Sequence, residues 1–221
     1  LPIENIFYLG SPLLSDIYFD KNYKEEKKHK NKFVILFSHA AKYYAIFDHS
    51  KEKESWTDTA LPINLLDSIC ELNFPLHLII RLHPTCKFKY KVELDLKRWK
   101  MRTNNTFEIT QGTTLNYDLY RSDLHITHQS AVLCEASEIG LRTLCLSEEI
   151  NFEKFIIAQI DNNNVILLEN QKDKIKEKIR YYYPIAKKKK ISQELYRKAY
   201  LKRLHSFLRD EISSATQNNN C

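Results

Sequence analysis

The sequence predicts an α/β fold in which a parallel β-sheet is flanked by helices. Continuous apolar runs such as KFVILF (32–37) and LHLIIRL (76–82) are typical of strands that are covered on both faces. Between them, LPINLLDSICEL (61–72) repeats its apolar residues every three or four positions, which indicates a helix. Buried strands that alternate with helices form right-handed βαβ units and hence a parallel sheet. The expected fold is therefore Rossmann-like.

The same alternation continues along the chain. Pro62 is tolerated in the first turn of the helix at 61–72, and the strand at 76–82 ends at His83 and Pro84. After these come a helix at 91–100, a weak strand at 107–110, a helical turn at 115–121, a strand at 124–127, a helix at 130–139, and strands at 142–147 and 164–169. Further helices are expected at 171–182 and 192–213.

We expect the chain to divide into three parts. Residues 1–31 are predicted to form an interdomain strand and a lysine-rich linker, and residues 32–183 the Rossmann-like domain. Residues 184–221 are predicted to form a C-terminal helix and a disordered tail. The chain begins with Leu1 rather than methionine, so we interpret it as part of a longer protein.

The chain is basic, with 34 Lys and Arg against 28 Asp and Glu and a net charge of +6. Such a charge favours anionic partners, namely nucleic acid, an anionic membrane surface or a phosphorylated ligand. Much of the excess lies in 21–32 and 186–191, which we interpret as solvated surface. No helix-turn-helix, zinc-finger or aromatic–basic pattern is present, so we expect no nucleic-acid partner. The basic last helices leave peripheral contact with the inner face of a membrane open.

The cysteines indicate a reduced protein. The five cysteines form no CxxC pair, and Cys70, Cys134 and Cys145 lie in apolar patterns, where we expect small buried hydrophobes. No secretion signal is visible and no run reaches the 18 to 20 or so apolar residues that span a bilayer. We therefore expect a cytoplasmic protein without disulfides or structural zinc.

Polar residues follow three of the predicted strands. In a parallel sheet, ligands bind beyond the carboxyl ends of the strands, so these residues predict a binding site at that rim. They are Ser38 and His39, His83 and Pro84, and the run His128, Gln129 and Ser130.

The segment THQSAVLCEASEIG (127–140) joins one strand end to a helix. A helix that begins at Ser130 directs its unpaired N–H groups at the rim, where a phosphate would bind, although Ser130 could equally be a plain N-cap. Glu135 lies five residues further along, a rise of about 7 Å, which matches the reach from a nucleotide phosphate to its ribose. The alternative is an exposed glutamate on an amphipathic helix, and Gly140 is a suitable C-terminal stop.

Histidines at the strand ends suit the chemistry of a leaving phosphate. Pro84 fixes an extended backbone before it, so His83 stands at a strand tip, where an imidazole can protonate or stabilise departing negative charge. Arg81 lies two residues earlier, so we expect it to point to the same side and to add a second donor for phosphate. The alternative for His83 is capping of a turn. His39 would line the site from the first loop, and His128 would contact the ligand or hydrogen-bond a neighbouring loop.

Two motifs resemble those of a known enzyme family. RLHP (81–84), followed by LYRSDLHITHQSAVLCEASEIGLRTLCL (119–146), resembles the C-terminal, donor-binding half of GT-B glycosyltransferases. The similarity is greatest to the capsule and surface-polysaccharide branch, with its polysialyltransferases, Kdo transferases and teichoic-acid-type glycerophosphotransferases. IFYLGSPLLSDIYFD (6–20) resembles the segment at which such chains leave the N-terminal domain. The resemblance covers about residues 5–170.

The resemblance implies roles for individual residues. His83 would contact the donor phosphate and take part in catalysis, Ser130 would be the second serine of the family's phosphate-binding pair, and Glu135 would bind the ribose. Gln129 departs from the family pattern, which has a serine or another small polar residue there. The acceptor site and the usual catalytic base belong to the family's N-terminal domain, so we expect this chain alone to be inactive.

The resemblance therefore implies a glycosyltransferase that acts in bacterial capsule or surface-polysaccharide biosynthesis. It would transfer a sugar from a UDP-, CDP- or CMP-linked donor to a glycan or lipid-linked acceptor. We expect no metal or other cofactor, because His83, Arg81 and the helix terminus would neutralise the leaving phosphate. The alternatives are a CDP-glycerol-type glycerophosphotransferase, a sugar-nucleotide 2-epimerase (whose histidine–arginine–glutamate signature is not found), and a non-catalytic nucleotide-binding or assembly module.

Overall fold

The computed structural model divides the chain into two compact units, Glu26–Lys190 and Leu1–Glu25 with Ile191–Cys221. The predicted strand and linker at 1–30, Gln129 and the end of the predicted tail lie outside the described residues. The structure describes residues 31–39, 61–84, 86, 89–110, 115–128, 130, 132–147, 164–185 and 193–218.

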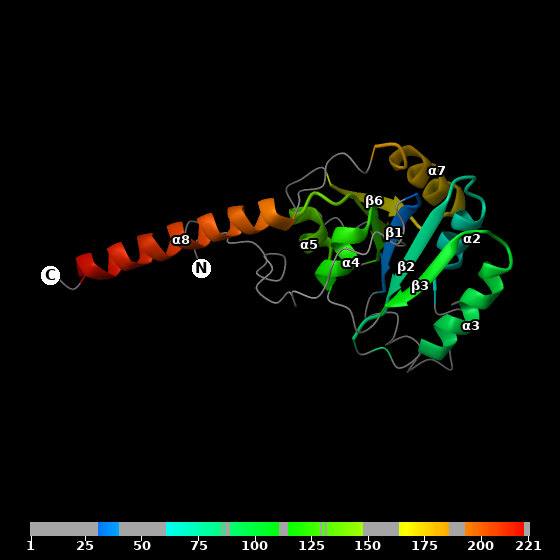
Figure 1. The fold of residues 1–221 in the computed structure, drawn as a ribbon, viewed down its shortest axis with the longest axis horizontal. Helices are drawn as coiled ribbons and strands as arrows, with labels where there is room; N and C mark the ends of the chain where they lie inside the picture. Colours follow the sequence, from blue (N-terminus) through cyan, green and yellow to red (C-terminus); the bar gives the residue numbers. More distant parts are fainter. Residues whose placement is uncertain are drawn as a thin grey trace. The chain divides into compact units, whose positions relative to one another are not determined.

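The larger unit is built on one six-stranded sheet in which each described pairing is parallel (Figure 1). Its strands are β1 (Phe33–Ser38), β2 (Leu76–Arg81), β3 (Thr106–Thr110), β4 (Leu124–Thr127), β5 (Thr143–Ser147) and β6 (Val165–Glu169). They lie in the order β3-β2-β1-β4-β5-β6, so the direction in which strands are added reverses between β1 and β4. This is the strand order of Rossmann folds, and it confirms the predicted fold class.

Helices cover both faces of this sheet, as Figure 1 shows. Helices α2, α3 and α7 lie on one face, and α4 and α5 lie on the other. Their bounds are α2 Ile63–Cys70, α3 Lys89–Lys100, α4 Leu115–Arg121, α5 Val132–Glu138 and α7 Lys172–Tyr182. Each of these helices falls within or close to a segment that the apolar periodicity predicts as helical, and even the weak strand at 107–110 is present as β3.

The two faces of the sheet differ in polarity. On the first, Phe33, Ile35 and Phe37 of β1 pack into the main apolar core with residues of α2, α3 and α7. The alternate side chains point to α4 and α5, and many of them are polar although they are buried. The polar strand residues of this second face include Ser38, His77, Arg81, Thr106, Glu108, Thr110, His125, Thr127 and Thr143.

Helix α5 ends at a glycine in the left-handed conformation, with φ 73° at Gly140. The N–H of Gly140 donates to the carbonyl of Ser137 at 2.9 Å, and the N–H of Leu141 donates to that of Ala136 at 2.9 Å. These two bonds form a Schellman motif, which satisfies carbonyls that the helix end would leave unpaired. The prediction that Gly140 stops this helix is confirmed.

The cysteine prediction is confirmed in part. Cys145 is buried and Cys70 is half-buried, and both are free thiols. Cys134 is exposed, so the prediction that it is a buried hydrophobe is wrong. The neighbouring Leu133, which is fully buried, is the α5 residue that packs against Cys145 and the sheet.

Helix α8 (Gln193–Asn218) belongs to the smaller unit. It has 26 residues and continues five residues beyond the predicted end at 213. Tyr200 on this helix is buried, whereas Leu195, Leu201 and Leu208 are exposed. Among the helices described here, α8 included, none combines the length and the apolarity that a membrane span needs.

Candidate functional site

The carboxyl ends of the strands place several of the predicted site residues side by side. One register row crosses five strands at this edge, and in-register neighbours of a parallel sheet point to the same face. The row consists of Thr110, Arg81, Ser38, Thr127 and Cys145. His39 and His128 follow Ser38 and Thr127 directly, at the ends of adjacent strands. The sheet thus brings together Arg81, Ser38, His39 and His128 from three separate segments of the chain.

His39 and His128 share one aromatic neighbour, Phe37. Each imidazole meets the Phe37 ring edge to face, with centroid separations of 6.0 Å for His39 and 6.1 Å for His128. Both histidines are buried. They lie where β1 and β4 adjoin, which is the point where the strand order reverses and where Rossmann-like sheets form a ligand crevice.

Ser38 is bound into the buried layer of the sheet. Its hydroxyl lies 2.9 Å from Nε2 of His125, and Nδ1 of His125 lies 3.1 Å from the hydroxyl of Thr143. The Thr143 hydroxyl donates to the carbonyl of Leu141, so it accepts from Nδ1–H, and Nε2 then accepts from Ser38. Burial lowers the pKa of His125 to about 3, which agrees with a neutral ring. A role for Ser38 in binding phosphate remains a prediction.

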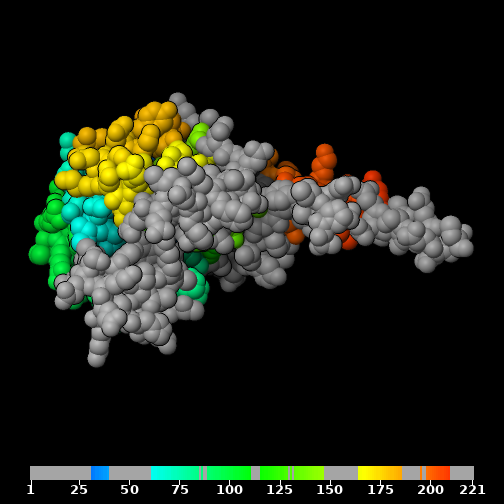
Figure 2. Space-filling view, turned by 180° about the vertical axis from the view of Figure 1, so that it is seen from behind, coloured from blue at the N-terminus to red at the C-terminus, as the bar shows by residue number. Residues whose placement is uncertain are grey.

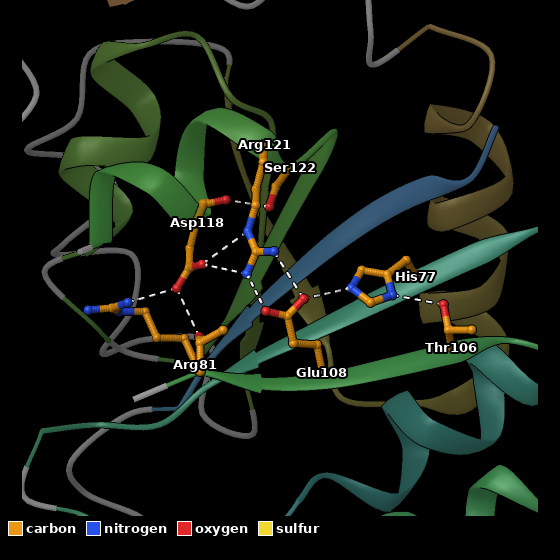
Figure 3. A network of polar contacts seen from close by, with 8 residues as sticks. His77, Arg81, Thr106, Glu108, Asp118, Arg121 and Ser122 are labelled. Atoms are coloured by element: carbon orange, nitrogen blue, oxygen red, sulfur yellow. Dashed lines mark hydrogen bonds and ion pairs between the residues drawn. The ribbon is translucent and has the colours of Figure 1, made fainter. Parts of the chain in front are cut away.

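Arg81 ends β2 and is held by a buried carboxylate on α4 (Figure 3). Its Nη1 donates to Oδ2 of Asp118 at 2.7 Å, and the hydroxyl of Thr110 donates to the same oxygen at 2.9 Å. Arg121 donates to the other oxygen of Asp118, from Nη2 at 2.7 Å and from Nε at 3.1 Å. The Asp118 side chain is 0% exposed and that of Arg81 16% exposed. Arg81 is therefore a fixed cation at the carboxyl edge.

The network continues from Arg121 toward the amino end of the sheet, as the dashed lines of Figure 3 show. Arg121 donates to both carboxylate oxygens of Glu108, at 3.0 Å and 2.9 Å. Glu108 in turn lies 3.1 Å from Nε2 of His77, whose Nδ1 lies 2.8 Å from the hydroxyl of Thr106. Burial acts to raise the pKa of Glu108, but its bonds with Arg121 and His77 outweigh burial and lower that pKa.

Sequence reasoning missed Asp118, Arg121 and Glu108. A signal for them does exist, because Glu108 and His77 interrupt otherwise apolar strands at positions that alternate with core residues. Charged residues at such positions need partners, and an adjacent amphipathic helix is the natural source. Asp118 and Arg121 are three residues apart and therefore lie on one side of that helix.

His83 is half-buried and lies two residues beyond Arg81, the last residue of β2. Its carbonyl accepts the N–H of Cys86 at 2.9 Å, so His83 also begins a turn. The preceding Leu82 donates its N–H to the carbonyl of Thr110, which extends the sheet by one bond beyond the strands. The geometry is compatible with both interpretations of His83, a ligand contact and a turn residue.

Ser130 caps the start of α5. Its hydroxyl accepts the N–H of Val132 at 3.3 Å, and its carbonyl accepts the N–H of Leu133 at 3.2 Å. This is the plain N-cap role that the sequence leaves open, and a role in phosphate binding remains a prediction. The helix itself has seven residues.

Glu135 is half-buried rather than fully exposed. Its Oε2 is buried and has no hydrogen-bond partner among the described residues. Burial raises the pKa of Glu135, because desolvation disfavours the charged carboxylate. A buried acceptor without a partner is costly and suits a hydroxyl-bearing ligand.

Metal ligation has no support within the described part of the chain. Among those residues, His, Cys, Asp and Glu side chains form no group of three that could hold a metal ion.

Comparison with known proteins identifies the fold. No protein-family model and no curated protein sequence matches the chain. Among solved structures it is similar to S. aureus MnaA in complex with UDP, with a TM-score of 0.53 and 14% identity over 94% of this chain and 54% of that one. The predicted GT-B-type fold is confirmed. At this identity the likeness shows the fold alone.

Two further structures are similar at lower TM-scores. The UDP-GlcNAc 2-epimerase of Neisseria meningitidis, bound to UDP-GlcNAc, gives a TM-score of 0.49 at 18% identity over 81% of this chain and 44% of that one. A structure of EarP, which mediates arginine glycosylation of elongation factor EF-P, gives 0.41 at 11% identity over 79% and 56%. The chain thus spans about half the length of each of these proteins.

Proposed function

We propose that Glu26–Lys190 is the donor-binding domain of a nucleotide-sugar-dependent glycosyltransferase. The observation that carries the proposal is the reversal of strand order between β1 and β4. His39 and His128 stand at this point, and Arg81 ends the adjacent strand β2. Crevices at such reversals bind nucleotides in Rossmann-like sheets.

The charges of the site suit a diphosphate. Arg81 is a permanent cation whose position is fixed by Asp118, and a fixed guanidinium is well suited to bind a phosphate. His83 stands beyond the same strand and would protonate or stabilise the departing phosphate. Glu135, with its buried Oε2, would accept hydrogen bonds from ribose hydroxyls.

The longer enzyme would transfer the sugar to a glycan or a lipid-linked acceptor in capsule or surface-polysaccharide biosynthesis. The motifs RLHP (81–84) and 119–146 support this branch. The acceptor site and the catalytic base would lie in a domain outside residues 1–221. The MnaA structure contains UDP, so UDP is the first nucleotide to test, followed by CDP and CMP.

Calorimetric titration of the chain with UDP, CDP and CMP tests the donor site. At least one nucleotide should bind, and His83→Ala and Glu135→Ala should each weaken that binding by roughly 10- to 100-fold, as expected for loss of a hydrogen bond to a charged group. His205→Ala, which changes an exposed histidine on α8, is the matched control and should bind as the parent does. The proposal fails if no nucleotide binds, or if both site variants bind with unchanged affinity.

Catalysis needs a separate experiment with the full-length gene product. Transfer of radiolabelled sugar from the nucleotide that binds should occur with the full-length protein and not with residues 1–221 alone. Loss of transfer in His83→Ala at a donor concentration that saturates the variant would assign a catalytic role to this histidine. Undiminished transfer in that variant would exclude it.

A further inference from the structure

Helix α3 carries two apolar sides. The inner one consists of Val92, Leu96 and Trp99, which are buried in the main core. The outer one is formed by Tyr90, Leu94 and Met101, with exposed fractions of 67%, 52% and 84%.

The three outer residues lie in one row. Residues four and seven apart fall on the same side of an α-helix, so positions 90, 94 and 101 lie within roughly 40° of one another around its axis. Met101 directly follows the last helical residue. Single exposed hydrophobics are common on protein surfaces, but an aligned row of large ones marks an interaction surface.

Basic side chains border this row. Lys89, Lys91, Lys97, Arg98 and Lys100 lie on α3 outside its buried side. The one exposed acid of the helix is Glu93, because Asp95 is buried. The outer surface therefore combines five basic residues, one acidic residue and a central apolar row, which we call the α3 surface. In both views α3 lies at the margin of its unit (Figures 1 and 2).

The charges of the α3 surface are poorly neutralised by the protein itself. Helix α7 is also rich in lysine, but Lys172 and Lys176 pair with Glu71 there, and Lys174 pairs with Glu169. By contrast, none of the ion pairs found among the described residues involves Lys89, Lys97, Arg98 or Lys100 of α3. The positive field of these four residues is thus available to an external anionic partner.

We propose that the α3 surface docks on an anionic membrane. Leu94 and Met101 would enter the boundary between headgroups and acyl chains, and Tyr90 would lie at the headgroup level, where amphipathic rings are favoured. The flanking lysines and Arg98 extend past the apolar row and contact lipid phosphates. Three apolar residues and about four net charges give weak and reversible binding.

A lipid surface fits the α3 surface better than the other anionic partners. Nucleic acid would satisfy the basic residues but would leave Leu94 and Met101 without an apolar environment. A protein partner would need an apolar centre inside an acidic rim. The charge pattern alone does not exclude such a partner, so the experiment separates it from a membrane. The inference is independent of the nucleotide site.

Sedimentation of the purified chain with lipid vesicles tests the proposal. The chain should bind vesicles that contain phosphatidylglycerol, should not bind vesicles of phosphatidylcholine alone, and should be released by salt. Lys97→Gln with Arg98→Gln should lower the partition coefficient roughly 25-fold, since each basic residue near an anionic surface contributes about fivefold. Leu94→Ser with Met101→Ser should lower it by about tenfold or more.

Matched variants on α7 and in the turn that follows it control for overall charge and hydrophobicity. Lys178→Gln with Arg180→Gln removes the same charge, and Tyr181→Ser with Ile185→Ser removes two exposed apolar side chains. Both control pairs should bind within about twofold of the parent, because these side chains lie outside the proposed contact. Thermal unfolding of each variant verifies that it is folded.

The proposal is overturned if the chain does not bind anionic vesicles or if it binds neutral vesicles equally well. It is also overturned if the double variants of α3 and the control double variants lose vesicle affinity to the same extent. It is also overturned if an RNA duplex or a dissolved acidic protein competes for the α3 surface while vesicles do not. A loss of vesicle binding in the two double variants of α3, but not in the control variants, supports the proposal.

Discussion

Oδ2 of Asp118 accepts a hydrogen bond from Nη1 of Arg81 at 2.7 Å, which joins a buried helix residue to the last residue of β2. The same carboxylate accepts hydrogen bonds from Thr110 and Arg121, so its negative charge is compensated on both oxygens. This arrangement fixes Arg81 at the carboxyl edge, next to Ser38 in the register. The cation that we assign to the donor phosphate thus depends on a residue whose side chain is fully buried.

Asp118→Asn should lower the free energy of unfolding by about 3 to 5 kcal/mol, because it removes the carboxylate that pairs with Arg81 and leaves Arg121 with Glu108 alone. Urea denaturation measures the change. Asp173→Asn is the control: its side chain is 83% exposed, and loss of its pair with Lys176 should cost at most about 1 kcal/mol. Equal losses in the two variants would contradict the buried network.

His125 should make the protein less stable in acid. Burial lowers the pKa of His125 from 6.5 to about 3, so the unfolded chain takes up the proton first as the pH falls. Stability is unaffected above about pH 6.5 and decreases between about pH 6.5 and pH 3, with a limiting slope of roughly 1.4 kcal/mol per pH unit.

Urea denaturation between about pH 7 and pH 5 measures this slope for the parent chain, His125→Gln and His205→Gln. The first variant should show a smaller slope, and the second, at an exposed position of α8, should keep the parental one. The same slope in all three proteins would show that His125 is not the responsible group.

The fold class could be predicted because short, continuous stretches of the sequence indicate its strands and helices. Runs such as 32–37 and 76–82 consist mostly of apolar residues, as is typical of covered strands, and the rule that ligands bind beyond parallel strands singled out Ser38, His39 and His128. The described structure places these three at adjacent strand ends.

The buried network could not be predicted in the same way. Glu108 and Arg121 become partners only because β3 is the edge strand beside β2 and α4 covers the same face. Apolar periodicity does not give the order of the strands, so the sequence can indicate that Glu108 needs a partner but not which residue supplies it. Cys134 illustrates the converse error, since an apolar context did not decide which side of α5 it occupies.

Glu71 should stabilise the packing of α2 against α7 in a manner that depends on salt. Its carboxylate accepts hydrogen bonds from Nζ of Lys172 at 2.8 Å and of Lys176 at 2.6 Å, and these bonds lower the pKa of Glu71 to about 2. The contribution is present above about pH 4.5 and is lost as the pH falls through about 2. Because the side chains of these pairs are partly accessible to solvent, salt should screen the pairs.

Thermal unfolding of Glu71→Gln measures this contribution. The melting temperature should fall slightly at low ionic strength, and the difference from the parent should disappear in high salt. Glu177→Gln changes an exposed glutamate of α7 and should melt as the parent does. A difference for Glu71→Gln that persists in high salt would mean that packing, and not charge, is responsible.

Replacing Gly140, which follows α5, should lower the stability of the protein, because its φ of 73° is unfavourable for residues with a Cβ atom. Gly140→Ala should cost about 1 kcal/mol or slightly more, and Gly140→Asn less, since Asn tolerates the left-handed conformation better. Urea denaturation should therefore rank the proteins Gly above Asn above Ala. Because the Schellman motif fixes the end of the helix that carries Glu135, the Ala variant should also bind nucleotide more weakly than the Asn variant. An Ala variant as stable as the parent would show that the helix end relaxes to another conformation, and Glu135 would then not depend on this cap.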